Sequence, residues 1–211
     1  MKIWAIIPAR QGSKSLPNKN ILKLKGIPLI AHSIKFAEKL SFIDRIIVST
    51  DSQEYANIAI EYGAEVPFLR GKKASNDDSM EEDVLLDIKK KCLNEGMDLP
   101  DAILWLRPTH PLRSIDHFEQ MNDLFQSGNY DSVIAVVETD SRIFLSQNNS
   151  LKHVIDDEYF TKHSMTRRQD SVKAFKMFYG ELFGFPETYN SAFLGDKIGF
   201  VTLPESCKKD I

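Results

Sequence analysis

The sequence predicts an α/β fold in which a mostly parallel sheet is covered by helices on both faces. Short apolar runs alternate with segments of helical periodicity between residues 2 and 137, and this order is typical of strands joined by crossover helices. Some apolar runs, such as residues 102–106, are continuous, which suits strands buried on both faces. With 211 residues and 42% hydrophobic residues, the chain is long enough for one ordinary domain, and we expect residues 1–211 to form it.

Each predicted strand is a short apolar run that ends in a polar, proline- or glycine-containing segment. The first stops at Pro8, and the second leads into Ser49-Thr50-Asp51. After residue 137 the pattern is interrupted, and it then returns. In chain order, the predicted strands are residues 2–8, 45–50, 65–69, 102–106, 131–137, 181–185 and 197–203.

The predicted helices carry apolar side chains on one face, at a spacing near 3.6 residues. Pro28 opens the first helix, since proline fits the first helical turn. Ser114 is a favoured cap for the fourth, and Gly63, Gly96 and Gly128 each follow the end of a helix, as glycine commonly does. In chain order, the predicted helices are residues 28–40, 52–62, 80–94, 114–126 and 188–194.

A segment at about residues 139–180 interrupts this alternation. It is polar, with the charged runs 156–158 and 167–170, and offers little that would bury in the main sheet. A long disordered loop is the alternative, but the segment holds too much apolar surface to leave in water. We therefore expect an inserted dimerisation arm, covered by a second subunit in a homodimer. Its apolar residues are Ile143, Phe144, Leu145, Val154, Ile155, Tyr159 and Phe160.

Composition excludes several functional classes. A formal net charge of −3 and a sequence pI near 6.0 provide no general basic field, so a nucleic-acid partner is not expected. No apolar run approaches the length of a membrane span or a signal sequence, and we expect a cytoplasmic protein without a membrane partner. Cys92 and Cys207 form no C-x-x-C pair, so reduced thiols are expected.

A polar loop with three cations follows the first predicted strand. Arg10, Lys14 and Lys19 supply the positive charge, while Gly12 and Ser13 allow backbone N–H groups to turn toward an anion. An ordinary solvated loop is the alternative, but open α/β sheets bind ligands at the end of their strands. A single glycine does not make the P-loop of ATPases. We interpret the loop as a triphosphate cradle.

Four motifs in order along the chain carry a resemblance to a known family. They are Ile7-Pro8-Ala9-Arg10-Gln11-Gly12-Ser13-Lys14 with Leu16-Pro17-Asn18-Lys19-Asn20, Val48-Ser49-Thr50-Asp51, residues 62–70, and Pro108-Thr109-His110-Pro111-Leu112-Arg113. Together they resemble the acylneuraminate cytidylyltransferases, that is, the CMP-sialic acid synthetases and relatives acting on other nonulosonic acids. The resemblance covers nearly the whole chain and implies a Rossmann-like fold of the nucleotide-diphospho-sugar transferase type.

The resemblance also implies a reaction. The anomeric hydroxyl of a nine-carbon 2-keto acid attacks the α-phosphorus of CTP, and pyrophosphate leaves; the product serves cell-surface polysaccharide biosynthesis. Such transfer depends mainly on positioning and charge neutralisation, so a cation cradle and Mg²⁺ are the expected parts of the site. The implied partners are CTP and a nonulosonic acid of the sialic, legionaminic or pseudaminic type.

The implied nucleotide site extends beyond the cradle. Arg70 matches a basic residue after the third predicted strand, and residues 75–79 match a polar stretch that lies next to cytosine in the family. For Ser79 the competing interpretation is a helix N-cap, and both roles are compatible because helix N-termini keep free N–H groups. The implied nucleotide-binding residues are Ala9, Arg10, Gly12, Ser13, Lys14, Lys19, Asn20, Arg70, Asp77 and Ser79.

The segment 106–113 is where the family meets the acceptor sugar. This chain has Arg107 where sialic acid enzymes usually have Gln, and His110 where they have Ser. An arginine at this position suits a bidentate contact with the sugar carboxylate, whereas His110 is equally well explained as a loop histidine bonded to the backbone. In the arm, Arg168 and Gln169 match an Arg-Gln run that reaches the acceptor, with a solvated charge as the alternative. The implied substrate-binding residues are Arg107, Thr109, His110, Arg168 and Gln169.

Asp210 is the expected metal ligand. It matches the first carboxylate of an Asp-x-Asp that binds Mg²⁺ in the family, and the second would follow Ile211. Two such carboxylates on an extended segment point the same way and share a hard cation. The implied catalytic residues are Arg10, Lys19 and Asp210.

Two alternatives stay open at this stage. One is transfer to an eight-carbon 2-keto acid of the Kdo type, although that sister family usually has Arg-Leu-Pro-Gly-Lys-Pro-Leu where this chain has Ser15-Leu16-Pro17-Asn18-Lys19-Asn20. The other is a non-catalytic nucleotide-binding subunit that kept the cradle. Turnover with CTP and a sugar panel would separate the three.

Overall fold

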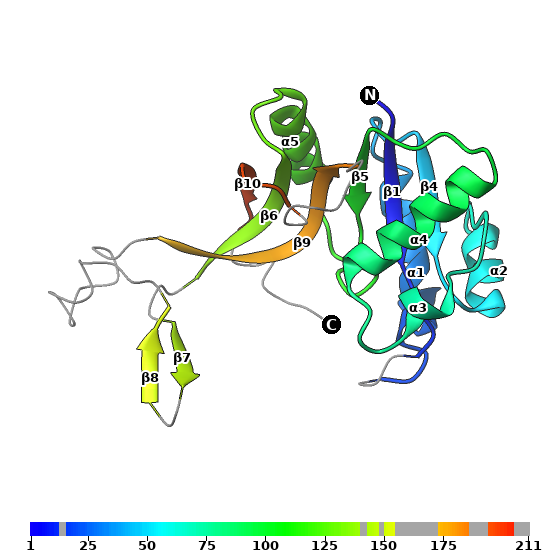
Figure 1. Cartoon of the computed structure of the whole chain (residues 1–211), viewed down its shortest axis with the longest axis horizontal. Helices are drawn as coiled ribbons and strands as arrows, with labels where there is room; N and C mark the ends of the chain where they lie inside the picture. The colour runs from blue at the N-terminus through cyan, green and yellow to red at the C-terminus, as the bar shows by residue number, and fades with distance from the viewer. Residues whose placement is uncertain (13–15, 140–142, 148–149, 155–172, 186–193, 205–211) are drawn as a thin grey trace, which may run out of the picture.

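The computed structural model describes residues 1–12, 16–139, 143–147, 150–154, 173–185 and 194–204. Its centre is a six-stranded sheet with the order β10-β6-β9-β5-β1-β4 (Figure 1). The strands are β1 (Ile3–Pro8), β4 (Arg45–Ser49), β5 (Ala102–Trp105), β6 (Ser132–Thr139), β9 (Ala174–Gly184) and β10 (Ile198–Thr202).

Five strands of this sheet run in one direction. β1 is parallel to β4 and β5, and β10 is parallel to β6. β9 lies between β5 and β6 and is antiparallel to both. The predicted α/β fold with a mostly parallel sheet is therefore confirmed, with one reversed strand at its middle.

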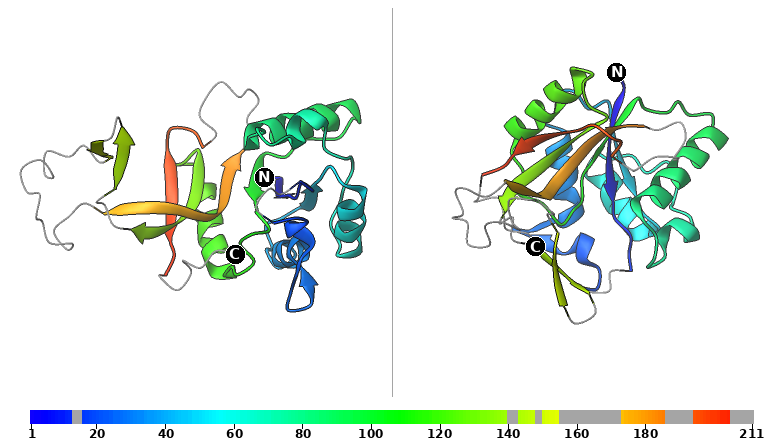
Figure 2. Two further views of the ribbon diagram at one scale, coloured as in Figure 1. Left: turned by 90° about the horizontal axis from the view of Figure 1, so that it is seen from below. Right: turned by 60° about the vertical axis from the view of Figure 1, so that its left-hand side comes forward.

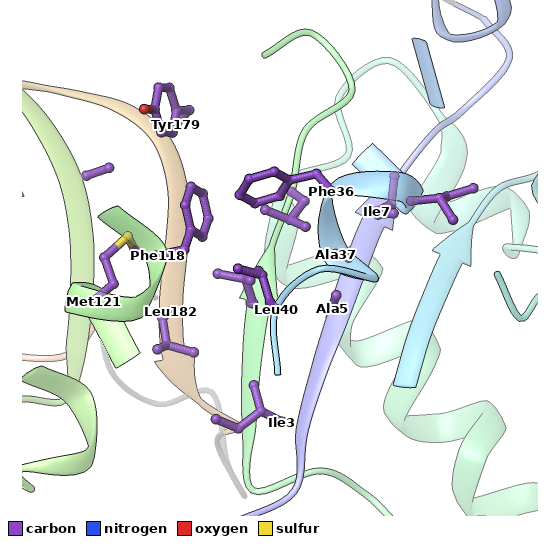
Figure 3. Close-up of a cluster of buried hydrophobic side chains, with 14 of the residues drawn as sticks. Ile3, Ala5, Ile7, Phe36, Ala37, Leu40, Phe118, Met121, Tyr179 and Leu182 are labelled. Atoms are coloured by element: carbon purple, nitrogen blue, oxygen red, sulfur yellow. The ribbon is translucent and has the colours of Figure 1, made fainter. Parts of the chain in front are cut away.

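Helices cover both faces of the sheet (Figure 2, left). On one face, α1, α2 and α5 contribute apolar side chains to the larger core; on the other, α4 packs against Trp4, Ile103 and Phe183. In Figure 3, Phe36 of α1 and Phe118 of α5 face each other, with ring centroids 4.8 Å apart in an edge-to-face arrangement. The helices are η1 (Lys19–Ile21), α1 (Leu29–Ala37), α2 (Gln53–Glu61), α3 (Lys72–Ser75), α4 (Glu81–Asn94) and α5 (Ile115–Gln126).

The predicted strand at residues 65–69 is wrong. Only Glu65 pairs with the sheet, in an isolated parallel bridge to Ile47. Its N–H donates to the Ile46 carbonyl at 2.8 Å and its carbonyl accepts from Val48 N–H at 2.9 Å. The next ladder bond would need the N–H of residue 67, which is Pro67, so the pairing stops. The predicted helix at residues 188–194 lies almost entirely outside the described residues.

Two small hairpins were not predicted. β2 (Lys23–Leu24) pairs with β3 (Ile27–Pro28), and β7 (Phe144–Gln147) pairs with β8 (Ser150–His153). The β7–β8 hairpin stands clear of the helices in Figure 1 and in the left view of Figure 2. It falls within the predicted arm, whereas the first half of β9 pairs with the end of β6 and so extends the main sheet into that segment. Dimerisation through the arm stays a prediction.

Among the described residues, the helices are too short or too polar to span a membrane.

Candidate active site

A cavity of about 480 Å³ opens where β1 and β5 end. Its wall includes Pro8, the last residue of β1, and Trp105, the last of β5. This is the carboxyl edge of the parallel strands, where open α/β sheets bind ligands. Seven residues predicted for nucleotide or substrate binding line the cavity together: Arg10, Lys19, Asn20, Arg70, Ser79, Arg107 and Thr109.

Arg10 is held at the cavity by an acidic partner. Its Nη1 donates to Asp77 Oδ1 at 2.8 Å and approaches the Asn76 carbonyl at 3.4 Å. Both side chains keep access to solvent, with 29% and 44% exposed. A triphosphate would compete with Asp77 for this guanidinium, because a phosphate and a carboxylate accept the same pair of N–H groups.

The turn that carries Lys19 is fixed from both sides. Asn18 adopts the left-handed conformation with φ 54°, and its side chain accepts from the Tyr55 hydroxyl at 3.3 Å. The buried amide of Asn20 donates to the Arg10 carbonyl at 3.0 Å, which joins η1 to the cradle loop. Lys19 itself makes no ion pair within the described part of the chain, so its ammonium group is available to a ligand.

Arg70 is a buried cation in the wall of the cavity. It is 8% exposed, and its Nε donates to Ser49 Oγ at 3.0 Å while Nη2 donates to the Ser49 carbonyl. Burial lowers the pKa of Arg70 to about 10, which leaves it charged at neutral pH. Its bonds fasten the loop after residue 65 to the end of β4, so Arg70 both shapes the wall and gives it positive charge.

The interpretation of Ser79 as a helix cap is wrong. Its Oγ lies 2.7 Å from the Lys73 carbonyl and 2.9 Å from Asn76 Oδ1, two acceptors for its one hydrogen, and so the hydroxyl closes the preceding turn. The start of α4 is stabilised instead by Asp83, whose carboxylate accepts from Met80 N–H at 3.1 Å. Ser79 remains at the cavity wall, where its role in nucleotide binding stays a prediction.

Arg107 lies between two glutamates. Its Nη1 donates to the carboxylate of Glu181, and its Nη2 donates to Glu81 Oε1 at 3.0 Å. Glu181 belongs to β9, lies opposite Trp105 in the strand register and is 0% exposed. Burial raises the pKa of Glu181, and Arg107 opposes that shift. The sequence contained one unused signal for Glu181, an acid inside an otherwise apolar predicted strand; Glu81 offered none.

Hydrogen bonds from Arg113 hold the segment after Arg107 in place. Arg113 donates to Ser33 Oγ at 3.1 Å and to the Arg107 carbonyl, and burial lowers the pKa of Arg113 to about 9. Thr109 lines the cavity, and its Oγ1 lies 3.3 Å from His110 Nδ1. The His110 ring does not line the cavity but packs edge-on against Phe178, with centroids 5.4 Å apart. Its contact with the substrate stays a prediction.

The structure describes only some of the remaining predicted residues. Ala9 is buried and donates its N–H to the Ser49 carbonyl at 2.9 Å, while Gly12 is exposed. Among the described residues, no group of three or more His, Cys, Asp or Glu side chains could hold a metal ion. Ser13, Lys14, Arg168, Gln169 and Asp210 lie outside the described residues.

A cation-lined cavity at the carboxyl edge of a doubly covered, mostly parallel sheet is typical of α/β nucleotide-binding proteins. A sequence profile described as cytidylyltransferase matches residues 4–192 of this chain. The chain therefore belongs to the cytidylyltransferase family, as its four motifs predicted.

Several curated relatives are similar over much of the chain. A pseudaminic acid cytidylyltransferase of Campylobacter jejuni is 33% identical over 83% of this chain and 75% of its own length. A CMP-N,N'-diacetyllegionaminic acid synthase of Legionella pneumophila is 46% identical over 54% of this chain and 48% of its own length. An N-acylneuraminate cytidylyltransferase of Streptococcus agalactiae is 37% identical over 66% of this chain. The matched region spans about half of the Legionella relative and 33% of the Streptococcus relative.

Solved structures share the fold at low sequence identity. A CMP:2-keto-3-deoxy-manno-octonic acid synthetase in complex with CTP has a TM-score of 0.68 at 16% identity, over 96% of this chain and 91% of the other. A 4-diphosphocytidyl-2C-methyl-D-erythritol synthase from Anaerococcus prevotii has a TM-score of 0.64 at 13% identity, over 100% and 92% of the two chains. These likenesses establish the architecture.

Proposed function

We propose that this chain transfers CMP from CTP to a nonulosonic acid and releases pyrophosphate. Three relatives named for the activation of legionaminic, pseudaminic and N-acylneuraminic acids support this reaction class. The structural observation that carries the proposal is the convergence of Arg10 and Lys19, from the loop after β1, and of Arg70, from the loop after residue 65, on one cavity. The relatives differ in their acid, so the proposal names the nonulosonic class as a whole.

The proposed chemistry uses this convergence directly. The acceptor hydroxyl forms a bond to the α-phosphorus of CTP, the bond from that phosphorus to the bridging oxygen breaks, and negative charge grows on the departing pyrophosphate. Lys19 is free to approach the triphosphate, Arg10 would exchange Asp77 for it, and Arg70 adds charge from the wall. Cations preorganised in a partly desolvated pocket stabilise such developing charge strongly. Transfer to a Kdo-type acid is less supported, since the likeness to that synthetase rests on 16% identity.

We also propose Mg²⁺ as the cofactor, bound through Asp210. Mg²⁺ in nucleotide sites is usually held by one or two carboxylates together with substrate phosphates. The carboxylates described at the cavity do not fit that task, because Asp77 pairs with Arg10 and Glu81 pairs with Arg107. No described residue is therefore assigned to the metal. The proposal is tested by the loss of turnover in chelator and its return with Mg²⁺.

A homodimer and a cytoplasmic location complete the proposal. Phe175 on β9 and Phe200 on β10 are 38% and 52% exposed, with ring centroids 5.2 Å apart. Ile198 and Met177 extend the same exposed apolar surface along these strands, and contiguous patches of this kind commonly mark interfaces. A second copy of the chain is the proposed cover. The cytoplasm is proposed because it is where CTP is available.

Pyrophosphate release tests the reaction. The protein is incubated with CTP, ATP, GTP or UTP in turn, each with sialic, legionaminic, pseudaminic and Kdo-type acids. We expect release with CTP and at least one nonulosonic acid. Binding of CTP in calorimetry without turnover on any acid would favour the non-catalytic subunit instead, and release with the Kdo-type acid alone would favour the sister family.

A further inference from the structure

Glu81 is the acidic side chain in a cavity otherwise lined by basic and neutral groups. Among the described residues that line the cavity, it is the one carboxylate, against four cations at Arg10, Lys19, Arg70 and Arg107. It is the first residue of α4, and its side chain is 35% exposed. Oε1 accepts from Arg107, whereas Oε2 has no hydrogen-bond partner within the described residues.

The ion pairs of Arg107 fix the position of the Glu81 carboxylate at the cavity. The guanidinium donates one bond to Glu81 and one to the fully buried carboxylate of Glu181. One positive charge between two negative ones leaves this group of three with a net charge of −1. The positive charge of Arg107 is thus already balanced by the two glutamates. Its role in this arrangement is to hold the Glu81 carboxylate at the cavity, and not to bind an anionic ligand.

A carboxylate in this position needs a hydrogen-bond donor as its partner. Phosphate oxygens only accept, so the triphosphate of CTP would repel Glu81, whereas the acceptor hydroxyl can donate to it. Glu81 is also tied to Arg107, two residues past the end of β5, beside Thr109 in the segment expected to meet the acceptor. A carboxylate that can accept a proton therefore lies beside the segment expected to meet the acceptor.

We propose that Glu81 is the general base of the transfer, with Arg107 and Glu181 as positioning residues. As the acceptor oxygen bonds to the α-phosphorus of CTP, its proton passes to Glu81 Oε2, and the bond to pyrophosphate breaks with its electron pair leaving on pyrophosphate. The assignment rests on the proposed cytidylyl transfer. Positioned general bases contribute rate factors of about 10²–10⁴.

Three variants of the whole chain test the assignment. Glu81→Gln keeps an oxygen that accepts from Arg107 but cannot take a proton, and Glu81→Asp keeps a carboxylate at a shorter reach. Glu82→Gln is the matched control, because it removes the same charge one residue further along α4 from a side chain that does not line the cavity. Turnover is measured at saturating CTP with varied acceptor, and CTP affinity is measured by calorimetry.

We expect Glu81→Gln to lower kcat by about 10²-fold or more, with KM for the acceptor and Kd for CTP changed by less than about 3-fold. Glu81→Asp should recover part of the rate, and Glu82→Gln should match the wild type. An unchanged kcat in Glu81→Gln overturns the assignment, as does a loss confined to CTP affinity, which would make Glu81 a nucleotide ligand. Wild-type protein that turns over no acceptor contradicts the proposed function itself and removes the reaction that the base would serve.

Discussion

Arg107 and Glu181 stand 74 residues apart in sequence and form an ion pair in which the glutamate is completely buried. The pair joins the segment after β5 to β9, the strand that runs against the rest of the sheet. One oxygen of Glu181, Oε2, is buried and has no hydrogen-bond partner within the part of the chain that the structure describes. The neutralisation of this carboxylate therefore depends on Arg107, and the first two predictions follow from that dependence.

Arg107→Met should destabilise the fold strongly. It removes the partner of a buried charge, a change that typically costs about 3–5 kcal/mol. The control is Arg45→Met, which breaks a more exposed pair with Glu65, whose side chains are 29% and 47% exposed; such pairs contribute about 1 kcal/mol or less. Urea unfolding measures both changes. Equal effects of the two substitutions would contradict the account of Glu181.

Glu181→Gln should change how stability depends on pH. Burial raises the pKa of Glu181, so the folded state holds this proton more tightly than the unfolded chain does. The stabilisation is complete below the unfolded value of about 4.3 and is lost as the pH rises through the folded value. Relative to the variant, the wild type should therefore lose free energy of unfolding above about pH 4.3. Parallel pH curves from urea unfolding would show that burial does not perturb this carboxyl.

Gly180→Ala should destabilise more than Gly128→Ala. Both glycines have positive φ, 83° and 72°, so each alanine costs about 1–2 kcal/mol of backbone strain. A Cβ on Gly180 would also lie 2.6 Å from Phe118 Cζ, whereas one on Gly128 meets nothing within 4 Å. Overpacking adds about 1–3 kcal/mol at Gly180. Thermal unfolding of the two variants gives the comparison, and equal losses would mean that Phe118 moves aside freely.

Lys19→Ala should reduce turnover severely without unfolding the protein. Removing one donor to developing charge typically costs about 2.7–4 kcal/mol, or 10²–10³-fold in kcat. Lys23→Ala is the control, since Lys23 is exposed on β2 and does not line the cavity. Pyrophosphate release and circular dichroism are measured on both variants. Full activity in Lys19→Ala would make Lys19 a surface residue without a part in the reaction.

Phe200→Asp should convert the proposed dimer to a monomer. It places a charge in the exposed apolar surface shared by β9 and β10, next to Phe175. Ile60→Asp is the control, because Ile60 is 56% exposed on α2 and lies outside that surface. Light scattering after size exclusion reports the mass of each. A monomeric wild type, or a dimer that survives Phe200→Asp, would contradict the proposed interface.

Local elements could be predicted from the sequence because their signals are local. The helix predicted at residues 114–126 is found at Ile115–Gln126, since its apolar period and the residues at its ends act within a few turns. The strand predicted at residues 65–69 was wrong, and the reason is visible only when its pairing with the neighbouring strand is known. Only the register with Ile47 shows that the missing N–H of Pro67 falls on a ladder position.

The residues of the site also fall into those that local sequence predicts and those that depend on a distant strand. Arg10 and Lys19 lie in the loop after the first strand, so their place at the carboxyl edge could be inferred from chain order. The pairing of Arg107 with Glu181 could not, because it depends on β9 inserting against β5, and apolar periodicity does not specify strand order. Whether Ser79 caps α4 also could not be predicted, because its hydroxyl donates instead to the Lys73 carbonyl in the preceding turn.

The central claim is that Arg10 and Lys19 hold the triphosphate of CTP in the cavity at the ends of β1 and β5. A crystal structure of the protein with CTP tests it most directly. We expect phosphate oxygens within hydrogen-bond distance of both side chains, with Arg10 drawn away from Asp77. A nucleotide bound elsewhere on the surface, with the Arg10–Asp77 pair intact, would contradict it.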